Sequence, residues 1–192
     1  SEEKFEHAMM SLKGAFGFMP RFQSLINPVP QPPRKERREE AARKLQRKMQ
    51  MEDKDKDVSV EFNEKGGLKI VLSNSILFDT AEADLKSGAF GVLDGLVDVF
   101  SDFPQATFEV RGHTDARPLR NHPRFRDNHD LSYYRADSVA RYIGQQRGMG
   151  LENIEITGCG ASQPVAPNDT PDGMSANRRV EIYVRGLGDE QA

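Results

Sequence analysis

Tryptophan is absent from this chain of 192 residues, and cysteine occurs once, as Cys159. A single cysteine excludes an internal disulfide and a metal cluster built from cysteine ligands. Basic residues are not in excess either, because 27 lysines and arginines stand against 30 aspartates and glutamates, a formal net charge of −3. This balance argues against general nucleic-acid binding, which requires a basic surface.

Long apolar runs and targeting signals are also missing. No run approaches the roughly 18 to 20 apolar residues that span a bilayer. The chain opens on Ser-Glu-Glu-Lys rather than on a basic and then apolar segment, so we expect no signal peptide. Because it does not begin with Met, we expect it to be a piece of a longer protein.

A short amphipathic helix is predicted over residues 1–19. Such a helix could dock on its own domain or on a dimer partner, or take a membrane-proximal or lid-like role. Its apolar side chains recur at helical spacing and form one stripe, made of Phe5, Met9, Leu12 and Phe16.

Residues 20–57 predict a linker followed by a charged helix. Five prolines between Pro20 and Pro33, with no periodic apolar face, are typical of an extended segment with polyproline character. From Arg34 onward the segment is strongly charged. Its narrow apolar stripe favours a solvated spacer helix, with a contact between two chains as the alternative; the stripe consists of Ala41, Leu45 and Met49.

Strand-like and helix-like patterns alternate after the linker, so we expect one compact domain over residues 58–192. Ser132 is the expected cap of the second helix, and a Pro-, Asn- and Asp-rich loop is expected up to Gly173. The alternation predicts an α/β fold, a two-layer sandwich of a small mixed sheet with helices on one face. The predicted strands span 58–62, 68–72, 107–111, 153–157 and 179–185, and the predicted helices span about 83–100 and 131–146.

A metal site is one interpretation of the histidines. His113, Asp115 and His122 are zinc ligands by residue type, as is His129. Their spacing matches no helical or loop ligand pattern, and the arginines at 120, 124 and 126 make a poor neighbourhood for a cation. We therefore expect no metal and no cofactor.

A catalytic triad of Ser132, His113 and Asp115 is the other enzymatic interpretation. A nucleophile elbow places its serine between glycines on a strand-to-helix turn, and Leu131-Ser132-Tyr133 does not. The glycines at 158 and 160 lack the spacing of a phosphate loop. We therefore expect no catalytic residues, and a binding protein rather than an enzyme.

Asp115 and Arg135 form the remaining candidate. Asp115 follows directly on a predicted buried strand, where loops present ligand-binding groups, and Arg135 lies one turn inside the helix expected to pack beside it. Spacing alone leaves two interpretations open. The two residues could form a salt bridge, worth little if exposed. They could also form a clamp, in which Asp115 attracts a ligand ammonium and the planar fork of Arg135 binds a ligand carboxylate.

Five spaced motifs between Phe78 and Val184 resemble, in order, the OmpA-like peptidoglycan-binding domain family. The stretch that contains them is a little over half of the chain. The motifs are Phe78-Asp79, Gly112-His-Thr-Asp115, Asn128-x-x-Leu131-Ser132-x-x-Arg135-Ala136-x-x-Val139, Gly158-x-Gly160-x-x-x-Pro164 and Asn177-Arg-Arg-Val-Glu-Ile182.

This resemblance implies roles for particular residues. In that family, the aspartate matching Asp115 and the arginine matching Arg135 bind the zwitterionic end of meso-diaminopimelate in the stem peptide of peptidoglycan. Thr114 and Asn128 are expected to support them. One arginine of the closing Asn-Arg-Arg motif is also expected to reach the site, and Arg178 is our choice.

Within the family, the chain is most similar to flagellar stator proteins of the MotB type. The shared features are a long insertion between Asp115 and Asn128, the phrase Pro164-Val-Ala-Pro-Asn168 and a charged segment before the domain. The similarity implies non-covalent anchoring of a flagellar stator to the cell wall, in support of motility and chemotaxis. Met174 departs from the pattern, since many relatives carry an arginine there.

The same similarity implies the surroundings of the protein. Its partners would be peptidoglycan, a MotA-type stator subunit and a second copy of the chain in a homodimer. It would be the periplasmic portion of an inner-membrane protein whose upstream transmembrane helix carries an ion-binding aspartate. Two other functions stay open. They are an OmpA-like anchor of another envelope complex, such as an outer-membrane lipoprotein or a secretion system, and a cell-wall hydrolase that uses the histidine and aspartate cluster.

Overall fold

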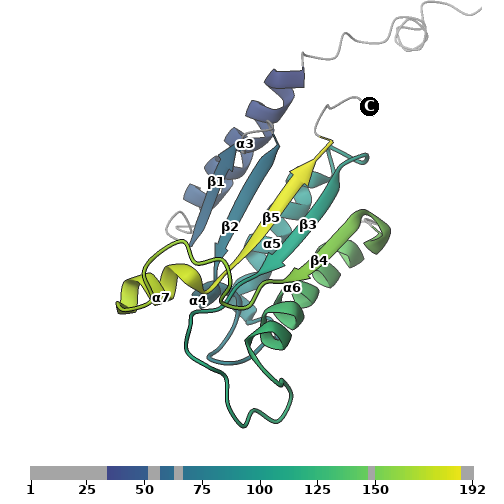
Figure 1. The fold of residues 1–192 in the computed structure, drawn as a ribbon. Coiled ribbons are helices and arrows are strands. Elements are labelled where there is room, and N and C mark those ends of the chain that lie inside the picture. The colour runs from purple at the N-terminus through teal and green to yellow at the C-terminus, as the bar shows by residue number, and fades with distance from the viewer. Residues whose placement is uncertain (1–33, 52–56, 63–66, 147–149, 187–192) are drawn as a thin grey trace, which may run out of the picture. The chain divides into compact units, whose positions relative to one another are not determined.

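The computed structural model describes residues 34–51, 57–62, 67–146 and 150–186. The helix predicted over residues 1–19 and the Pro-rich segment before Arg34 lie outside these ranges. Within them, five strands form one sheet in the order β1-β2-β5-β3-β4 (Figure 1). Only β3 and β4 pair in parallel among the described strands; the other neighbours are antiparallel.

The bounds of the five strands agree with the predicted ones to within one residue or two. The strands are β1 (Val58–Phe62), β2 (Leu68–Ser73), β3 (Thr107–Gly112), β4 (Ile154–Gly158) and β5 (Arg179–Arg185). The helices are α3 (Arg34–Met51), α4 (Asn74–Leu77), α5 (Ser87–Phe100), α6 (Asn128–Gln145), α7 (Pro171–Asn177) and the 3-10 turn η2 (Leu151–Asn153).

The core lies between one face of the sheet and the helices. Leu68, Ile70 and Leu72 alternate with more exposed residues along β2 and are buried on this face. Helices α5 and α6 cover the same face with their apolar stripes (Figure 1). The predicted two-layer α/β sandwich with a small mixed sheet is therefore confirmed. In the described part of the chain, no helix is both long and apolar enough to cross a bilayer.

Helix α5 begins at Ser87, later than the predicted start near Ala83. The backbone before it is extended, because Leu85 forms an isolated bridge with Phe78 and the Lys86 N–H donates to the Leu77 carbonyl at 2.9 Å. A residue whose backbone is paired in this way cannot also follow helical dihedral angles. Leu85 therefore packs against the core from a loop rather than from the helix.

Helix α6 begins at Asn128 and is capped by Asp127, so the predicted cap Ser132 is wrong. The Asp127 side chain accepts from the Asp130 N–H at 2.9 Å, as an N-cap residue does. Ser132 lies in the second turn and is fully buried. Its hydroxyl donates to the His129 carbonyl at 2.9 Å and accepts from the Gly160 N–H at 2.8 Å, which ties α6 to the bend after β4.

Helix α7 begins within the loop predicted up to Gly173. Thr170 caps it by accepting from the Gly173 N–H at 3.1 Å, and Pro171 occupies the first helical turn. A capping threonine followed by proline is a common helix start. The helix is too short to show an apolar period, so only these two residues could have revealed it.

Helix α3 packs onto the domain, so the prediction of a solvated spacer helix is wrong. Its apolar side chains belong to the same core as the sheet, and Gly95 of α5 lies so close that an added Cβ would meet Met49 Cε at 2.8 Å. Contacts group the chain from Arg34 onward into one compact unit, which places α3 with the domain expected to begin near Val58. The buried residues of α3 are Ala41, Ala42, Leu45 and Met49.

Truncating Leu45 tests this packing. Leu45 is fully buried, so Leu45→Ala should lower the free energy of unfolding by about 2 to 3 kcal/mol through lost apolar burial and a residual cavity. The exposed neighbour Gln46 provides the control, since Gln46→Ala should change that free energy by less than about 0.5 kcal/mol. Urea denaturation measures both variants. Equal stabilities would show that α3 does not pack there in solution.

One edge of the sheet gathers the polar motifs. β3 and β4 run parallel, and β5 runs antiparallel to β3, so the ends of β3 and β4 lie beside the start of β5. β2 is also antiparallel to β5 and ends at the same edge. The loop between β3 and α6, the short helix α4 and helix α7 all attach there (Figure 1).

Candidate functional site

Asp115 lies in the loop between β3 and α6, with only 6% of its side chain exposed. Arg117 donates to it four times: its backbone N–H to Oδ1 at 3.0 Å, its Nε to the two oxygens at 3.2 and 3.1 Å, and its Nη2 to Oδ2 at 2.7 Å. Arg178 Nη1 donates to Oδ2 at 2.8 Å. The carboxylate is thus held by two guanidinium groups.

These contacts set the charge of Asp115. Burial raises the pKa of the Asp115 carboxyl, but the hydrogen bonds from Arg117 and Arg178 outweigh burial, so the net pKa lies below the ordinary value. Asp115 is therefore an anion at neutral pH. It has the charge that a ligand ammonium requires.

Arg135 lies inside α6 and is 3% exposed. Its Nε donates to the Glu82 carbonyl at 2.8 Å, and its guanidinium carbon lies 5.4 Å from the centre of the Phe78 ring. Burial lowers the pKa of Arg135 to about 10, and the nearby charge of Arg178 acts in the same direction. The group still carries a proton at neutral pH, and its described contacts are a carbonyl and an aromatic face rather than a carboxylate.

Asp115 and Arg135 lie close enough to interact electrostatically, yet they form no salt bridge with each other among the described contacts. Asp115 pairs with Arg117 and Arg178 instead. The salt-bridge interpretation of this pair is therefore wrong. The loop, α6 and the end of α7 bring three arginines to the Asp115 carboxylate, and the Glu82 carboxylate also acts on Arg135. The cations outnumber these two anions, so an anionic ligand group could neutralise the surplus positive charge.

Thr114 and Asn128 support the loop rather than the carboxylate itself. The Thr114 N–H donates to the Gly160 carbonyl at 2.9 Å, which joins the loop to the bend after β4. Asn128 Nδ2 donates to the carbonyl oxygens of Asp115 and Arg117 at 3.3 and 2.9 Å. These bonds fix the backbone on both sides of the carboxylate. Whether either residue contacts a ligand stays a prediction.

The two arginines of the Asn-Arg-Arg motif have different partners. Arg179 is buried and donates from Nε to Glu181 Oε1 at 2.8 Å and from Nη1 to the Asn177 carbonyl at 3.2 Å. Arg178 contacts Asp115. Arg178, chosen from the sequence, is therefore the one that the structure places beside Asp115, and its contact with a ligand stays a prediction.

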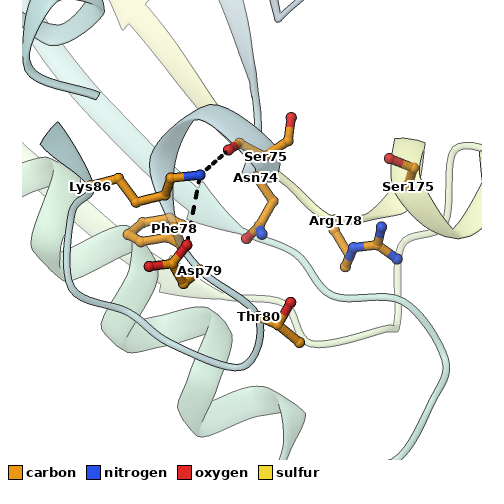
Figure 2. A pocket seen from close by; sticks show the side chains of 8 residues that line it. All are labelled: Asn74, Ser75, Phe78, Asp79, Thr80, Lys86, Ser175 and Arg178. Carbon is orange, nitrogen blue, oxygen red and sulfur yellow. Dashed lines mark hydrogen bonds and ion pairs between the residues drawn. The ribbon is translucent and has the colours of Figure 1, made fainter. Parts of the chain in front are cut away.

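A cavity of about 270 Å³ adjoins these residues (Figure 2). Phe78 and Arg178 line it, and the same two side chains contact Arg135 and Asp115. Lys86 lines it as well, and Figure 2 shows its ammonium bonded to the backbone of the α4 segment and to the carboxylate of Asp79. Asp115 and Arg135 are not among the residues that line the cavity, and each contacts one residue that does.

The histidines do not converge on one point. His113 is buried, with Nε2 at 3.4 Å from Glu181 Oε2, and the His122 ring stacks on Phe125 at 4.8 Å between centroids. Within the described ranges, no three His, Cys, Asp or Glu side chains are arranged to hold a metal ion. Burial raises the pKa of Glu181, while contacts with His113 and Arg179 outweigh it and bring the net pKa well below the ordinary value.

Sequence reasoning did not assign a role to Arg117, although it makes the most contacts with Asp115. Its position two residues after an aspartate was the available signal, since an aspartate commonly accepts the backbone N–H two residues on. Asn168 was also missed as a structural contact. Its side chain accepts from the Ala116 N–H at 3.1 Å and from Asn177 Nδ2 at 2.9 Å, which ties the loop to the segment before α7.

A comparison with protein families gives a match over most of this site. A model of the OmpA family matches residues 77–178. Among curated proteins, Motility protein B of Bacillus subtilis (strain 168) is 30% identical over 122 residues, which are 64% of this chain and 46% of that protein. The chain therefore spans less than half the length of this relative.

Two solved structures share the fold over most of this chain. A MotB like protein from Desulfovibrio vulgaris superposes with a TM-score of 0.70 at 25% identity, covering 78% of this chain and 94% of that one. The cell wall anchor of the T6SS from Pseudomonas aeruginosa superposes with a TM-score of 0.62 at 29% identity, covering 73% of this chain and 95% of that one.

Proposed function

Because the chain belongs to the OmpA family, we propose that it binds peptidoglycan non-covalently through Asp115, Arg135 and Arg178. The observation that supports this most is the buried charge cluster at the end of β3. One anionic carboxylate lies there beside cations from α6 and from the end of α7. Such a cluster suits a ligand group that carries an ammonium and a carboxylate on one carbon, as one end of meso-diaminopimelate does.

The charges assign a place to each ligand group. The ammonium would bind Asp115, the anion of the cluster. The ligand carboxylate would bind Arg135 and Arg178. Arg135 should gain more from this contact, because its buried charge contacts only a carbonyl and an aromatic face in the free protein. A guanidinium can bind a carboxylate through two parallel hydrogen bonds, which adds specificity as well as affinity. This is the chemistry of binding, with no reacting group required.

We further propose that this binding anchors a flagellar stator of the MotB type to the cell wall. The similarities to Motility protein B and to the MotB like structure support this role. The domain would lie in the periplasm as part of an inner-membrane protein, with a MotA-type subunit as partner. In a homodimer, binding of the first site to the wall holds the second site near it at a high effective concentration. Two weak sites then attach the protein more strongly than one. A stator that exerts torque needs such a fixed support.

The similarity to the cell wall anchor of the T6SS favours a second candidate, an anchor of another envelope complex. Deletion of the gene that encodes the full-length protein distinguishes the stator from the second candidate. This deletion should abolish swimming while filaments still assemble if the chain is part of a stator. Normal swimming with a loss of protein secretion or of envelope integrity would favour the second candidate.

Two tripeptides that each compete with sacculi for the protein test the wall-binding site. Protein retained on purified sacculi should be released by L-Ala-γ-D-Glu-meso-diaminopimelate. The matching tripeptide with L-lysine lacks the carboxylate beside its second ammonium, so it should compete at least about tenfold more weakly, since Arg135 and Arg178 lose their anion. Co-sedimentation at a series of peptide concentrations measures both. Equal competition would contradict the proposed site, and release of soluble muropeptides would favour a hydrolase.

A further inference from the structure

The Asp115 carboxylate offers no free position to a ligand ammonium. A carboxylate has roughly four lone-pair positions, and Asp115 already accepts five hydrogen bonds from Arg117 and Arg178. Its side chain is only 6% exposed. A ligand that needs this carboxylate must therefore displace a donor that holds it in the free protein.

We propose that Arg117 is an internal competitor of the ligand. Its guanidinium occupies, in the free protein, the place on Asp115 that the ligand ammonium takes in the complex. Arg117 therefore lowers the apparent affinity of the site for any ligand that needs this carboxylate. This inference rests on the proposed function, since it concerns the same carboxylate.

Exposure indicates which arginine leaves. The Arg117 side chain is 65% exposed, whereas that of Arg178 is 29% exposed. The Arg117 guanidinium is already largely in water, so its release changes its own solvation little, and the ligand ammonium replaces it on the buried carboxylate. Arg178 also lines the adjoining cavity, where it can bind the ligand carboxylate without leaving its place. Arg117 is thus the donor that can leave Asp115 most easily.

The backbone keeps the carboxylate oriented when the guanidinium leaves. The Arg117 N–H donates to Asp115 Oδ1, and Asn128 Nδ2 holds the Arg117 carbonyl at 2.9 Å. Both bonds involve the backbone of Arg117 and persist while its side chain rotates outward. Three of the five hydrogen bonds to Asp115 come from that side chain. Its departure therefore frees an acceptor position on each oxygen, while the Arg117 N–H and Arg178 keep theirs.

Any ligand ammonium exchanges one cation for another at Asp115, and the ligand carboxylate supplies the net gain in binding free energy. A ligand with only an ammonium replaces the Arg117 guanidinium at Asp115. Its net binding free energy is small, since one charged hydrogen-bond donor substitutes for another. A ligand with an adjacent carboxylate gains in addition the contact with Arg135 and Arg178. Displacing Arg117 costs both ligands the same free energy, so a plain amine is left with almost no net affinity while a zwitterion keeps the contribution of its carboxylate.

Removing the competitor should tighten binding. Isothermal titration of the whole chain with L-Ala-γ-D-Glu-meso-diaminopimelate should show that Arg117→Ala binds about threefold to tenfold more tightly than the wild type. Arg120 is exposed in the same loop and has the same charge, so Arg120→Ala should stay within about twofold of the wild type. In the wild type, the NMR signal of the Arg117 Nε–H, assigned by its loss in Arg117→Ala, should shift when this tripeptide is added.

Two other results would overturn this inference. Unchanged or weaker binding by Arg117→Ala would show that Arg117 does not compete, provided that the wild type binds and Asp115→Asn does not. An Arg117 Nε–H signal that does not respond to saturating tripeptide would show that the side chain stays on Asp115. If Asp115→Asn binds as well as the wild type, the proposed function itself fails, and the inference fails with it.

Discussion

Asp115→Asn should lower the affinity for peptidoglycan by about 100-fold. The substitution keeps the size of the side chain and removes the negative charge that would bind the ligand ammonium. Loss of one partner from a buried charged pair costs about 2 to 5 kcal/mol, and each 1.4 kcal/mol corresponds to about a tenfold change in affinity. The amide NH₂ would also face the donors of Arg117 and Arg178, which need acceptors.

The control for this variant removes the same charge elsewhere. Asp137 lies on α6, where its carboxylate pairs with Arg141 at 2.7 Å. Asp137→Asn should bind sacculi within about twofold of the wild type. Co-sedimentation with sacculi measures binding, and thermal unfolding confirms that each variant is folded. A folded Asp115→Asn protein that is retained like the wild type would refute the assignment of Asp115 to the site.

Gly112→Ala should have the largest effect on folding, with a loss of about 3 kcal/mol or more in the free energy of unfolding. A Cβ at Gly112 would lie 1.9 Å from the backbone oxygen of Ser132 and 2.8 Å from its carbonyl carbon. Both atoms belong to the backbone of α6, so they cannot rotate away as a side chain could. Either β3 or α6 must shift, and overpacking of this kind costs about 1 to 3 kcal/mol, sometimes more.

Gly88 provides a matched glycine in open space. A Cβ added there meets no atom within 4 Å, and the residue lies in the first turn of α5. Gly88→Ala should therefore raise the free energy of unfolding by up to about 1 kcal/mol, through the lower entropy of the unfolded chain. Urea denaturation compares the two variants. A Gly112→Ala protein as stable as the wild type would contradict the close approach of β3 and α6.

The two predictions concern the same junction. Gly112 is the last residue of β3, and Asp115 follows three residues later in the loop. The close approach at Gly112 places the start of α6, and with it Arg135, beside the Asp115 loop. A shift of α6 should therefore weaken binding as well as stability, so Gly112→Ala should lose sacculus retention even under conditions in which it stays folded.

Apolar periodicity predicted the sheet well because each strand is long enough to show its alternation. β5 has the predicted bounds, Arg179–Arg185, and the buried residues of β2 are those of one alternating set. The errors lie where tertiary contacts outweigh the local pattern. The narrow stripe of α3 suffices for burial because α5 offers a glycine, Gly95, at the contact. Ser132 had the residue type of a cap, but Asp127 holds that position.

The residue types at the candidate site are determined by the sequence itself. Asp115 follows a recognisable strand, Arg178 precedes another, and Arg135 lies inside a helix. Their gathering at one sheet edge could therefore be expected from topology. Which of them bond to each other could not. Arg178 reaches Asp115 across 63 positions, because β5 lies between β2 and β3 in the sheet, and spacing along the chain carries no information on that distance.

Tertiary structure alone decided which arginines pair with the Asp115 carboxylate. Arg135 is committed to the Glu82 carbonyl and the Phe78 ring, and Arg117, a residue of the loop itself, covers Asp115 instead. Hydrogen-bond geometry and burial select among several arginines of equal charge, and both depend on how the loop, α6 and α7 are packed. The sequence thus determined which charges are available, and the packing decided which of them are paired and which are left for a ligand.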